Sequence, residues 1–193
     1  MRTIIPAGAR LIPKNAKSVF TGKIYDVYQW EQELYDGTSD TFEMLKRPDT
    51  IETIGIQDNK LVILKEEQPS LGPAFYGLPG GRHDVEGETE LAAAKREMLE
   101  ETGLSFHNWK LIGVQQPHTK IDWFVYLFVA CDITGQTSQH LDAGEKIEIK
   151  LMTLEEVRKL TRDPAVRNLP RDLFEKIASI DDLKKLPEYQ VKS

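Results

Sequence analysis

The chain has 193 residues, of which 40% are hydrophobic, and a formal net charge of −6 at pH 7. This length and apolar content suffice for one domain with a buried core, with or without a small extension. The acidic balance argues against a nucleic-acid backbone as the main partner, because such a partner calls for a basic face. The single cysteine, Cys131, excludes an internal disulfide and fits a reducing compartment.

The longest apolar run, residues 123–131, is too short to cross a bilayer as a helix. The N-terminus carries prolines and positive charges but no apolar signal core. We therefore expect a cytoplasmic protein with no membrane partner. Cys131 falls inside the apolar run, so we interpret it as a buried strand residue and not as a nucleophile.

Residues 1–17 are expected to be an irregular lead-in, because they contain two prolines and a glycine. From Val19 to Leu34, apolar and polar residues alternate as they do in a strand. Asp36-Gly37 is a favoured hairpin turn, and a returning strand follows at residues 41–47. The pattern predicts an antiparallel β-hairpin near the N-terminus.

Two further β-rich runs, residues 50–57 and 60–68, are joined by Asp58-Asn59 and predict a second hairpin. Prolines and glycines then favour a loop over residues 69–81, with no regular structure until Leu78. After this loop the pattern changes to that of a helix.

The predicted helix covers residues 89–102. Thr89 or Glu88 can cap its start, and Gly103 stands where a left-handed residue ends a helix. An apolar stripe that should face the core consists of Leu91, Ala94 and Met98.

Glu97, Glu100 and Glu101 stand at positions i, i+3 and i+4 of this helix, so they share one face, which we expect to be turned partly away from the core. Their like charges repel, and a hard divalent cation such as Mg²⁺ would compensate them. Arg96 lies beside this face. Its guanidinium could hold Glu88 in a bidentate pair and so fix the preceding loop to the helix.

Beyond the helix, residues 109–117 and 122–133 are expected to form strands, the second nearly continuous in apolar character and therefore central. Residues 141–157 contain a loop, an alternating strand and, from Thr153, the capping-box start of a short helix. Two small amphipathic helices are predicted between Pro170 and Leu186.

The spacing of the glycines, glutamates and arginine in residues 81–104 resembles the signature of the Nudix hydrolase family. That signature is a glycine, five residues, a glutamate, seven residues, Arg-Glu, an apolar residue, any residue, Glu-Glu, any residue, a glycine and an apolar residue. From Glu88 onward the chain matches it completely, with Arg96, Glu97, Met98, Leu99, Glu100, Glu101, Thr102, Gly103 and Leu104. Six residues, not five, separate Gly81 from Glu88, which we interpret as a one-residue insertion in the loop. The alternative, a solvated acidic helix after a glycine turn, would not require Arg96 and Gly103 in register as well.

The resemblance implies an α/β (α+β) fold, namely the Nudix mixed-sheet α/β/α sandwich, here with an N-terminal antiparallel β extension. We assign residues 1–48 to the lead-in and β-hairpin and residues 49–193 to the Nudix hydrolase domain. The resemblance also implies a Mg²⁺ cofactor, with Mn²⁺ as a substitute. The implied metal ligands are Glu97, Glu100, Glu101 and the backbone carbonyl of Gly80, the alternative for Gly80 being a glycine needed only for a turn.

Glu101 and Arg96 are the residues of the signature expected to act in catalysis. In the related enzymes an acidic residue of a later loop completes the site as general base or further metal ligand. Asp142 and Glu145 are the candidates here, and Glu145 fits the family pattern better; a glutamate of the signature is the other candidate for the base.

The N-terminal strands resemble those of the ADP-ribose pyrophosphatase branch, in which this sheet takes part in a homodimer and contributes to the neighbour's adenine pocket. Tyr28 and Trp30 are candidates to stack on a base, although aromatic residues of strands more often pack in a core or interface. Pro117, thirteen residues after Leu104, is similar in position to a proline of that branch. Arg82, in the loop with the insertion, is a further candidate for substrate binding.

The implied substrate is a nucleoside diphosphate linked to another moiety, with ADP-ribose first, hydrolysed to AMP and ribose 5-phosphate. Two features of the branch are missing: an arginine where the chain has Gln68-Pro69-Ser70 and a glutamate where it has Gly77. The alternatives are a Nudix hydrolase for another nucleotide sugar, a dinucleoside polyphosphate or an oxidised nucleotide, and a non-catalytic nucleotide-sensing module.

Overall fold

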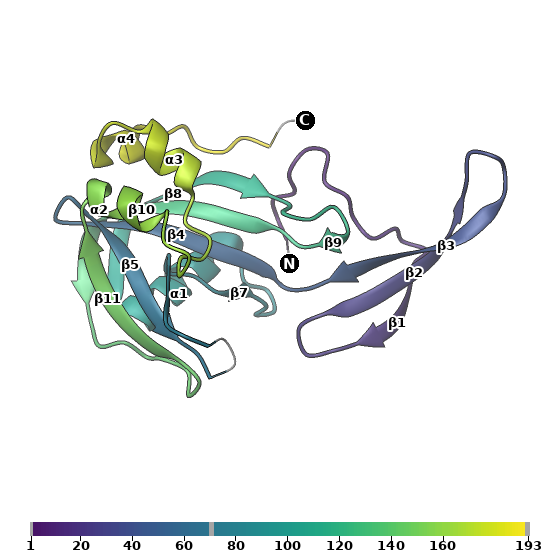
Figure 1. Ribbon diagram of the computed structural model, residues 1–193, viewed down its shortest axis with the longest axis horizontal. Helices are drawn as coiled ribbons and strands as arrows, with labels where there is room; N and C mark the ends of the chain where they lie inside the picture. Colours follow the sequence, from purple (N-terminus) through teal and green to yellow (C-terminus); the bar gives the residue numbers. More distant parts are fainter. Residues whose placement is uncertain (1, 70–71, 192–193) are drawn as a thin grey trace.

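The computed structural model describes residues 2–69 and 72–191 of the chain. Within these ranges the chain forms two β-sheets and four helices (Figure 1). Ser70, part of the segment where the related branch has an arginine, lies outside the described residues. One sheet forms an arm and the other is the centre of a layered domain.

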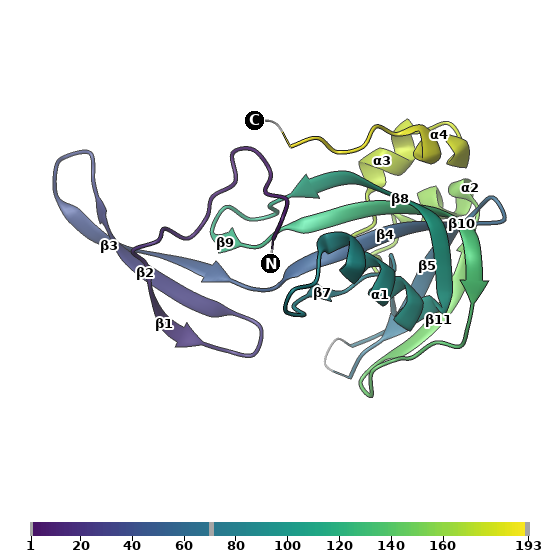
Figure 2. The same cartoon turned by 180° about the vertical axis from the view of Figure 1, so that it is seen from behind.

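The arm projects away from the layered domain, as Figures 1 and 2 both show. Its strands are β1 (Lys17–Thr21), β2 (Asp26–Glu33), β3 (Ser39–Lys46) and the short β9 (Ile121–Asp122). The first three pair antiparallel, which confirms the N-terminal β extension, and β9 pairs parallel with the end of β3. Gly37 adopts φ 82° in the predicted hairpin turn, a conformation that glycine reaches without steric cost.

The single strand predicted from Val19 to Leu34 is wrong in one respect. The chain turns within it, because the Gly22 N–H donates to the Tyr25 carbonyl at 3.0 Å and closes a tight connection between β1 and β2. Thr21, Gly22 and Lys23 interrupt the alternation at this turn, and Gly22 is the signal in the sequence that could have marked the break.

The main sheet has the strand order β11-β5-β4-β10-β8, with β6 paired to β5 and β7 to β4. Its strands are β4 (Asp49–Gln57), β5 (Lys60–Glu67), β6 (Phe75–Gly77), β7 (Arg82–His83), β8 (Leu104–Gln115), β10 (Val125–Gln136) and β11 (Lys146–Met152). β4 and β10 are parallel, whereas β10 pairs antiparallel with β8 and β5 pairs antiparallel with β11. The predicted mixed sheet is confirmed.

The hairpin of β4 and β5 is confirmed, with Asp58 and Asn59 at φ 48° and 57°, as a two-residue hairpin turn requires. The two strands pair only next to this turn, at Ile56 with Leu61 and at Gln57 with Lys60. Further along they diverge, and β6 pairs with β5 in place of β4. The divergence leaves room between the strands for the loop of the signature.

Three boundaries differ from the sequence prediction. The loop predicted until Leu78 contains the short strand β6, β8 begins at Leu104 directly after the helix, and β10 runs to Gln136. The cross-strand pair between Leu104 and Gln136 explains both extensions, since pairing carries each strand beyond its apolar run. Cys131 lies on β10 as predicted, but it is half-buried.

Helix α1 (Glu90–Thr102) covers one face of the main sheet, and the other face is covered by α2 (Leu154–Leu160), α3 (Arg171–Lys176) and α4 (Ile180–Lys185) (Figure 2). The core on the α1 side includes Ile51, Ala93, Ala94 and Phe128, and the core on the opposite side includes Ile54, Val129, Val157, Phe174 and Leu183. The three layers confirm the α/β/α sandwich. None of the helices in the described ranges is long and apolar enough to span a membrane.

The described lead-in contains no helix or strand before β1, as predicted, yet its first residues bind the layered domain. The Arg2 guanidinium pairs with the buried carboxylates of Asp49, at 2.5 Å, and Asp122. The Thr3 N–H donates to Glu90 at the start of α1 at 2.6 Å. Buried carboxylates are costly unless paired, so these contacts compensate three of them. The predicted boundary between residues 1–48, the lead-in and β-hairpin, and the domain of residues 49–193 stays a prediction.

Candidate active site

Gly80 and Gly81 bring the loop of the signature against β4. The Ile51 N–H donates to the Gly81 carbonyl at 2.9 Å, and the Thr53 N–H donates to the Pro79 carbonyl at 2.8 Å. A Cβ at Gly80 would overlap the Ile51 carbonyl, and one at Gly81 would lie 2.5 Å from the Glu97 carboxylate. Gly80 therefore needs glycine for this close approach to backbone, whereas at Gly81 the close atoms belong to the end of a flexible side chain. Whether the Gly80 carbonyl binds a metal stays a prediction.

The ends of α1 are those predicted from the sequence. The Thr89 hydroxyl accepts from the Ala92 N–H at 3.2 Å, and Gly103 ends the helix in the left-handed conformation at φ 71°. These caps satisfy backbone groups that the helix itself leaves free. They fix where the helix starts relative to the glycine loop.

The buried face of α1 differs from the prediction. Leu91 is 39% exposed, so its assignment to the apolar stripe is wrong, whereas Ala94 and Met98 are buried. Glu90 and Glu101 lie on the buried face as well, at 2% and 6% exposure. The helix can bury these two carboxylates because each accepts a hydrogen bond from a backbone N–H. The Thr3 N–H donates to Glu90, and the Gly80 N–H donates to Glu101 at 2.7 Å. The expected orientation of Glu101 away from the core is thus corrected.

Arg96 holds the glutamates of the loop and helix together. It binds Glu88 through two nitrogens, at 2.9 and 3.1 Å, which confirms the predicted bidentate pair. Its Nη1 also donates to Glu97 at 2.8 Å and to Glu100 at 3.1 Å. A further bond to the Arg82 carbonyl, at 3.1 Å, fixes the loop to the helix.

A cluster of carboxylates lies where these elements meet, and it includes a residue that the sequence reasoning missed. Burial and the nearby charges of Glu66, Glu97 and Glu145 raise the pKa of Glu101 well above its usual range, against the hydrogen bond from Gly80. Burial and the charge of Glu145 raise the pKa of Glu66 to about 7. Burial likewise raises the pKa of Glu97, although Arg96 opposes this. We define these four glutamates together with Glu100 as the acidic cluster.

Glu66 could have been found from the period-two pattern of β5. Val62 packs on the α1 side of the sheet, and residues two apart in a strand share a face, so Glu66 projects to the same side as Glu101. Glu145 precedes β11, which pairs with β5, and this brings it beside Glu66. Asp142 is exposed, whereas Glu145 is half-buried and its charge raises the pKa of Glu66, Glu97 and Glu101. Which of the two loop candidates acts in the site stays a prediction.

The acidic cluster has the donor chemistry of a site for a hard divalent cation, because it offers only carboxylate oxygens and several of them are buried beside like charges. The described residues contain no ready-made group of three or more acidic, histidine or cysteine side chains at metal-binding geometry. Glu97 and Glu100 instead bond Arg96, and Glu101 bonds Gly80. The residues fit such an ion in charge and type, and binding would exchange part of the Arg96 contacts for metal contacts.

Comparison with known proteins decides the family. The family model of the NUDIX domain matches residues 46–173. The chain belongs to the NUDIX family. It is a Nudix pyrophosphohydrolase, and the family prediction made from the signature is confirmed.

Two curated relatives and one solved structure resemble the chain over most of its length. An ADP-ribose pyrophosphatase of Bacillus subtilis (strain 168) is 28% identical over 155 residues, which are 78% of this chain and 82% of that protein. The methanol dehydrogenase activator of Bacillus methanolicus is 24% identical over 153 residues, with the same coverage of 78% and 82%. The crystal structure of an ADP compounds hydrolase has a TM-score of 0.67 at 21% identity and covers 83% of this chain and 86% of its own, which supports the Nudix fold.

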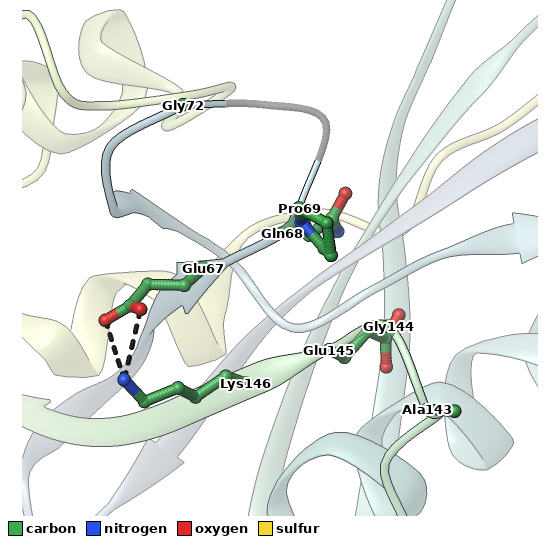
Figure 3. Close-up of a pocket in the computed structure, with 8 residues that line it drawn as sticks. All are labelled: Glu67, Gln68, Pro69, Gly72, Ala143, Gly144, Glu145 and Lys146. Carbon is green, nitrogen blue, oxygen red and sulfur yellow. Dashed lines mark hydrogen bonds and ion pairs between the residues drawn. The ribbon is translucent and has the colours of Figure 1, made fainter.

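A hollow of about 410 Å³ opens beside the acidic cluster of this Nudix enzyme, between the end of β5 and the loop before β11. Figure 3 shows Gln68 and Pro69 on one wall and Glu145 on the other. Lys146 turns to Glu67 and pairs with it at 3.0 Å. Glu145 therefore lines an accessible space where a bound molecule could reach the cluster.

A larger hollow, of about 640 Å³, lies on the sheet face that α3 covers. Its lining includes Pro117 in the loop after β8, together with Glu52, Trp123 and the segment 168–173. Its size is that of a small-molecule site. The structure thus places Pro117 in a hollow, while its role in binding substrate stays a prediction.

Glu52 is the unexpected residue of this hollow. Burial raises its pKa to about 7, from an ordinary value of 4.5. Above pH 7 the carboxylate is charged in the folded and unfolded states, and its burial then lowers stability. Below about pH 4.5 it is protonated in both states, and the penalty disappears.

We expect Glu52→Gln to raise the free energy of unfolding by about 3 kcal/mol at pH 8, because the amide carries no charge to bury. The gain should shrink toward zero near pH 4.5. Urea denaturation at both pH values measures it, with the exposed Glu188→Gln as a control for the loss of one charge. An equal gain at both pH values would contradict burial as the cause.

Tyr28, Trp30 and Arg82 are the remaining candidates for substrate binding. The Arg82 carbonyl accepts a hydrogen bond from Arg96, whereas the two aromatic residues lie elsewhere. Tyr28 and Trp30 lie on β2 in the arm, away from α1 in both views, and Trp30 packs near Phe42 with ring centres 6.3 Å apart. Arg82 is exposed on β7 and pairs with Asp84 at 3.6 Å. Within one chain the structure does not bring the two aromatic residues to the carboxylates.

Proposed function

We propose that this Nudix enzyme hydrolyses the pyrophosphate bond of a nucleoside diphosphate linked to another moiety, with ADP-ribose as the first substrate and AMP and ribose 5-phosphate as products. The observation that carries the proposal is the acidic cluster, which gathers glutamates from β5, α1 and the loop before β11 around the glycine loop. The curated relative named as an ADP-ribose pyrophosphatase supports the choice of substrate. The cytoplasm is the expected compartment, in keeping with the single cysteine.

Mg²⁺, with Mn²⁺ as a substitute, would be held by Glu97, Glu100, Glu101 and the Gly80 carbonyl. When bound, such an ion neutralises phosphate charge and lowers the pKa of a bound water. The chain itself orients the ligands: the Gly80 N–H fixes Glu101, and Arg96 fixes Glu97 and Glu100. Glu145 lines the adjacent hollow, where its carboxylate can accept the proton of an attacking water.

A hydrolysis screen tests the proposal. Purified protein with Mg²⁺ is incubated with ADP-ribose, other nucleotide sugars, dinucleoside polyphosphates and nucleoside triphosphates, and the products are identified by chromatography. Preference for ADP-ribose with release of AMP is the expected result. Preference for another of these compounds would overturn the substrate but keep the reaction class, and tight binding without turnover would make the protein a nucleotide sensor.

The arm supports a second part of the proposal, a homodimer. It leaves Val19, Phe20, Ile24 and Tyr25 exposed, which a second copy could cover. In such a dimer Tyr28 and Trp30 would approach the site of the partner, as the branch resemblance implies. Light scattering at micromolar protein concentration is expected to give twice the chain mass, and the mass of a single chain would contradict the dimer.

A further inference from the structure

The positive charges around the acidic cluster differ in what they bind. Arg96 forms ion pairs with three glutamates, and Lys146 forms one with Glu67. Arg167 is exposed and forms no ion pair within residues 2–69 and 72–191. An unpaired arginine next to a group of buried carboxylates is available for an anion that approaches them.

The fold places Arg167 beside the cluster. Its N–H donates to the Tyr76 carbonyl at 2.8 Å, so its segment runs alongside β6. β6 in turn pairs with β5, where Phe75 lies opposite Glu66. Arg167, Phe75 and Glu66 therefore lie on three adjacent segments, and Glu66 is the member closest to the rest of the cluster.

The side chain of Arg167 is held in this place by an aromatic ring. Its guanidinium carbon lies 4.0 Å from the centroid of Phe75, which is itself 8% exposed and therefore fixed. A cation over a ring face is attracted electrostatically and keeps its outer N–H groups free. The positive charge of Arg167 also lowers the pKa of Glu66, so it acts electrostatically on a member of the acidic cluster.

We propose that Arg167 binds a phosphate group of the diphosphate substrate at the β6 edge of the acidic cluster. The inference rests on the proposed function and adds a substrate-binding residue to it. A planar guanidinium offers paired N–H donors that match phosphate oxygens, and the ring under it reduces the freedom lost on binding. The hollow beside Glu145 lies toward β11, on the other side of β5, so a diphosphate held from the β6 edge would lie across the carboxylates.

The first test measures binding of inorganic pyrophosphate by calorimetry in the presence of Mg²⁺. Arg167→Ala is expected to weaken binding about tenfold or more, since a charge-assisted contact is lost. Arg167→Lys should recover part of the affinity, because it keeps the charge without the paired donors. Arg162→Ala, which removes another exposed arginine that lines neither hollow, is the charge-matched control and should bind as the unmodified chain does.

The second readout is steady-state hydrolysis of ADP-ribose. Arg167→Ala should raise KM about tenfold and leave kcat within about threefold, a division that general loss of structure would not produce. Unchanged pyrophosphate binding and KM in Arg167→Ala would overturn the inference while the proposed function stood. If the unmodified chain hydrolysed nothing, the proposed function would fail, but a loss of pyrophosphate binding confined to the Arg167 variants would still support the phosphate site. If the unmodified chain did not bind pyrophosphate, the inference that Arg167 binds a phosphate group would be overturned.

Discussion

Glu101→Gln is expected to lower the rate of hydrolysis by about 10³-fold, because a neutral amide would bind and charge-balance a divalent cation far less well than a carboxylate. Glu101 is the most buried member of the signature's acidic face and is held by the Gly80 N–H. The amide oxygen of glutamine can keep accepting that hydrogen bond, so the geometry of the loop should survive. The measurement is kcat with the preferred substrate at saturating Mg²⁺.

The same variant should remain folded. Burial raises the pKa of Glu101, so in metal-free buffer at pH 8 the folded state carries a penalty for the charged carboxylate that the amide does not have. We expect the melting temperature in EDTA at pH 8 to equal or exceed that of the unmodified chain. Glu188→Gln, an exposed substitution of the same kind, should leave rate and melting temperature unchanged. Normal turnover by Glu101→Gln would remove Glu101 from the mechanism.

Features set by neighbours in sequence were predictable. The caps of α1 at Thr89 and Gly103, the turn at Asp58-Asn59 and the pair of Arg96 with Glu88 follow from local rules of helices, hairpins and motif spacing. Each depends on a short stretch of chain. The α/β/α fold followed from the signature because the signature is long and specific.

Features that depend on strand register were not predictable from one sequence. Glu66 and Arg167 are 101 residues apart, and only the pairing of β5 with β6, and of β6 with the segment before α3, brings them together. The error at Leu91 has a related cause. A helix with acidic residues on its buried face cannot be oriented from its apolar residues alone, because the partners of Glu90 and Glu101 come from the lead-in and the glycine loop.

Gly80→Ala is expected to prevent stable folding, with a loss above about 4 kcal/mol. The added Cβ would overlap the Ile51 carbonyl and would lie 2.9 Å from the Ile51 carbonyl carbon and 3.0 Å from the Glu52 Cα. All these atoms belong to the backbone of the central strand β4, which cannot move without breaking its bonds to residues 79–81. Circular dichroism and thermal denaturation measure the loss.

Gly81→Ala is the matched comparison, because its Cβ meets a side chain in place of the backbone. The clash is with the Glu97 carboxylate, which can rotate away and leave Arg96. We expect a folded protein, destabilised by about 1–2 kcal/mol, whose activity falls because Glu97 is displaced from the acidic cluster. If Gly80→Ala melted at the temperature of the unmodified chain, the close approach of the loop to β4 would be wrong, and with it the position of Glu101.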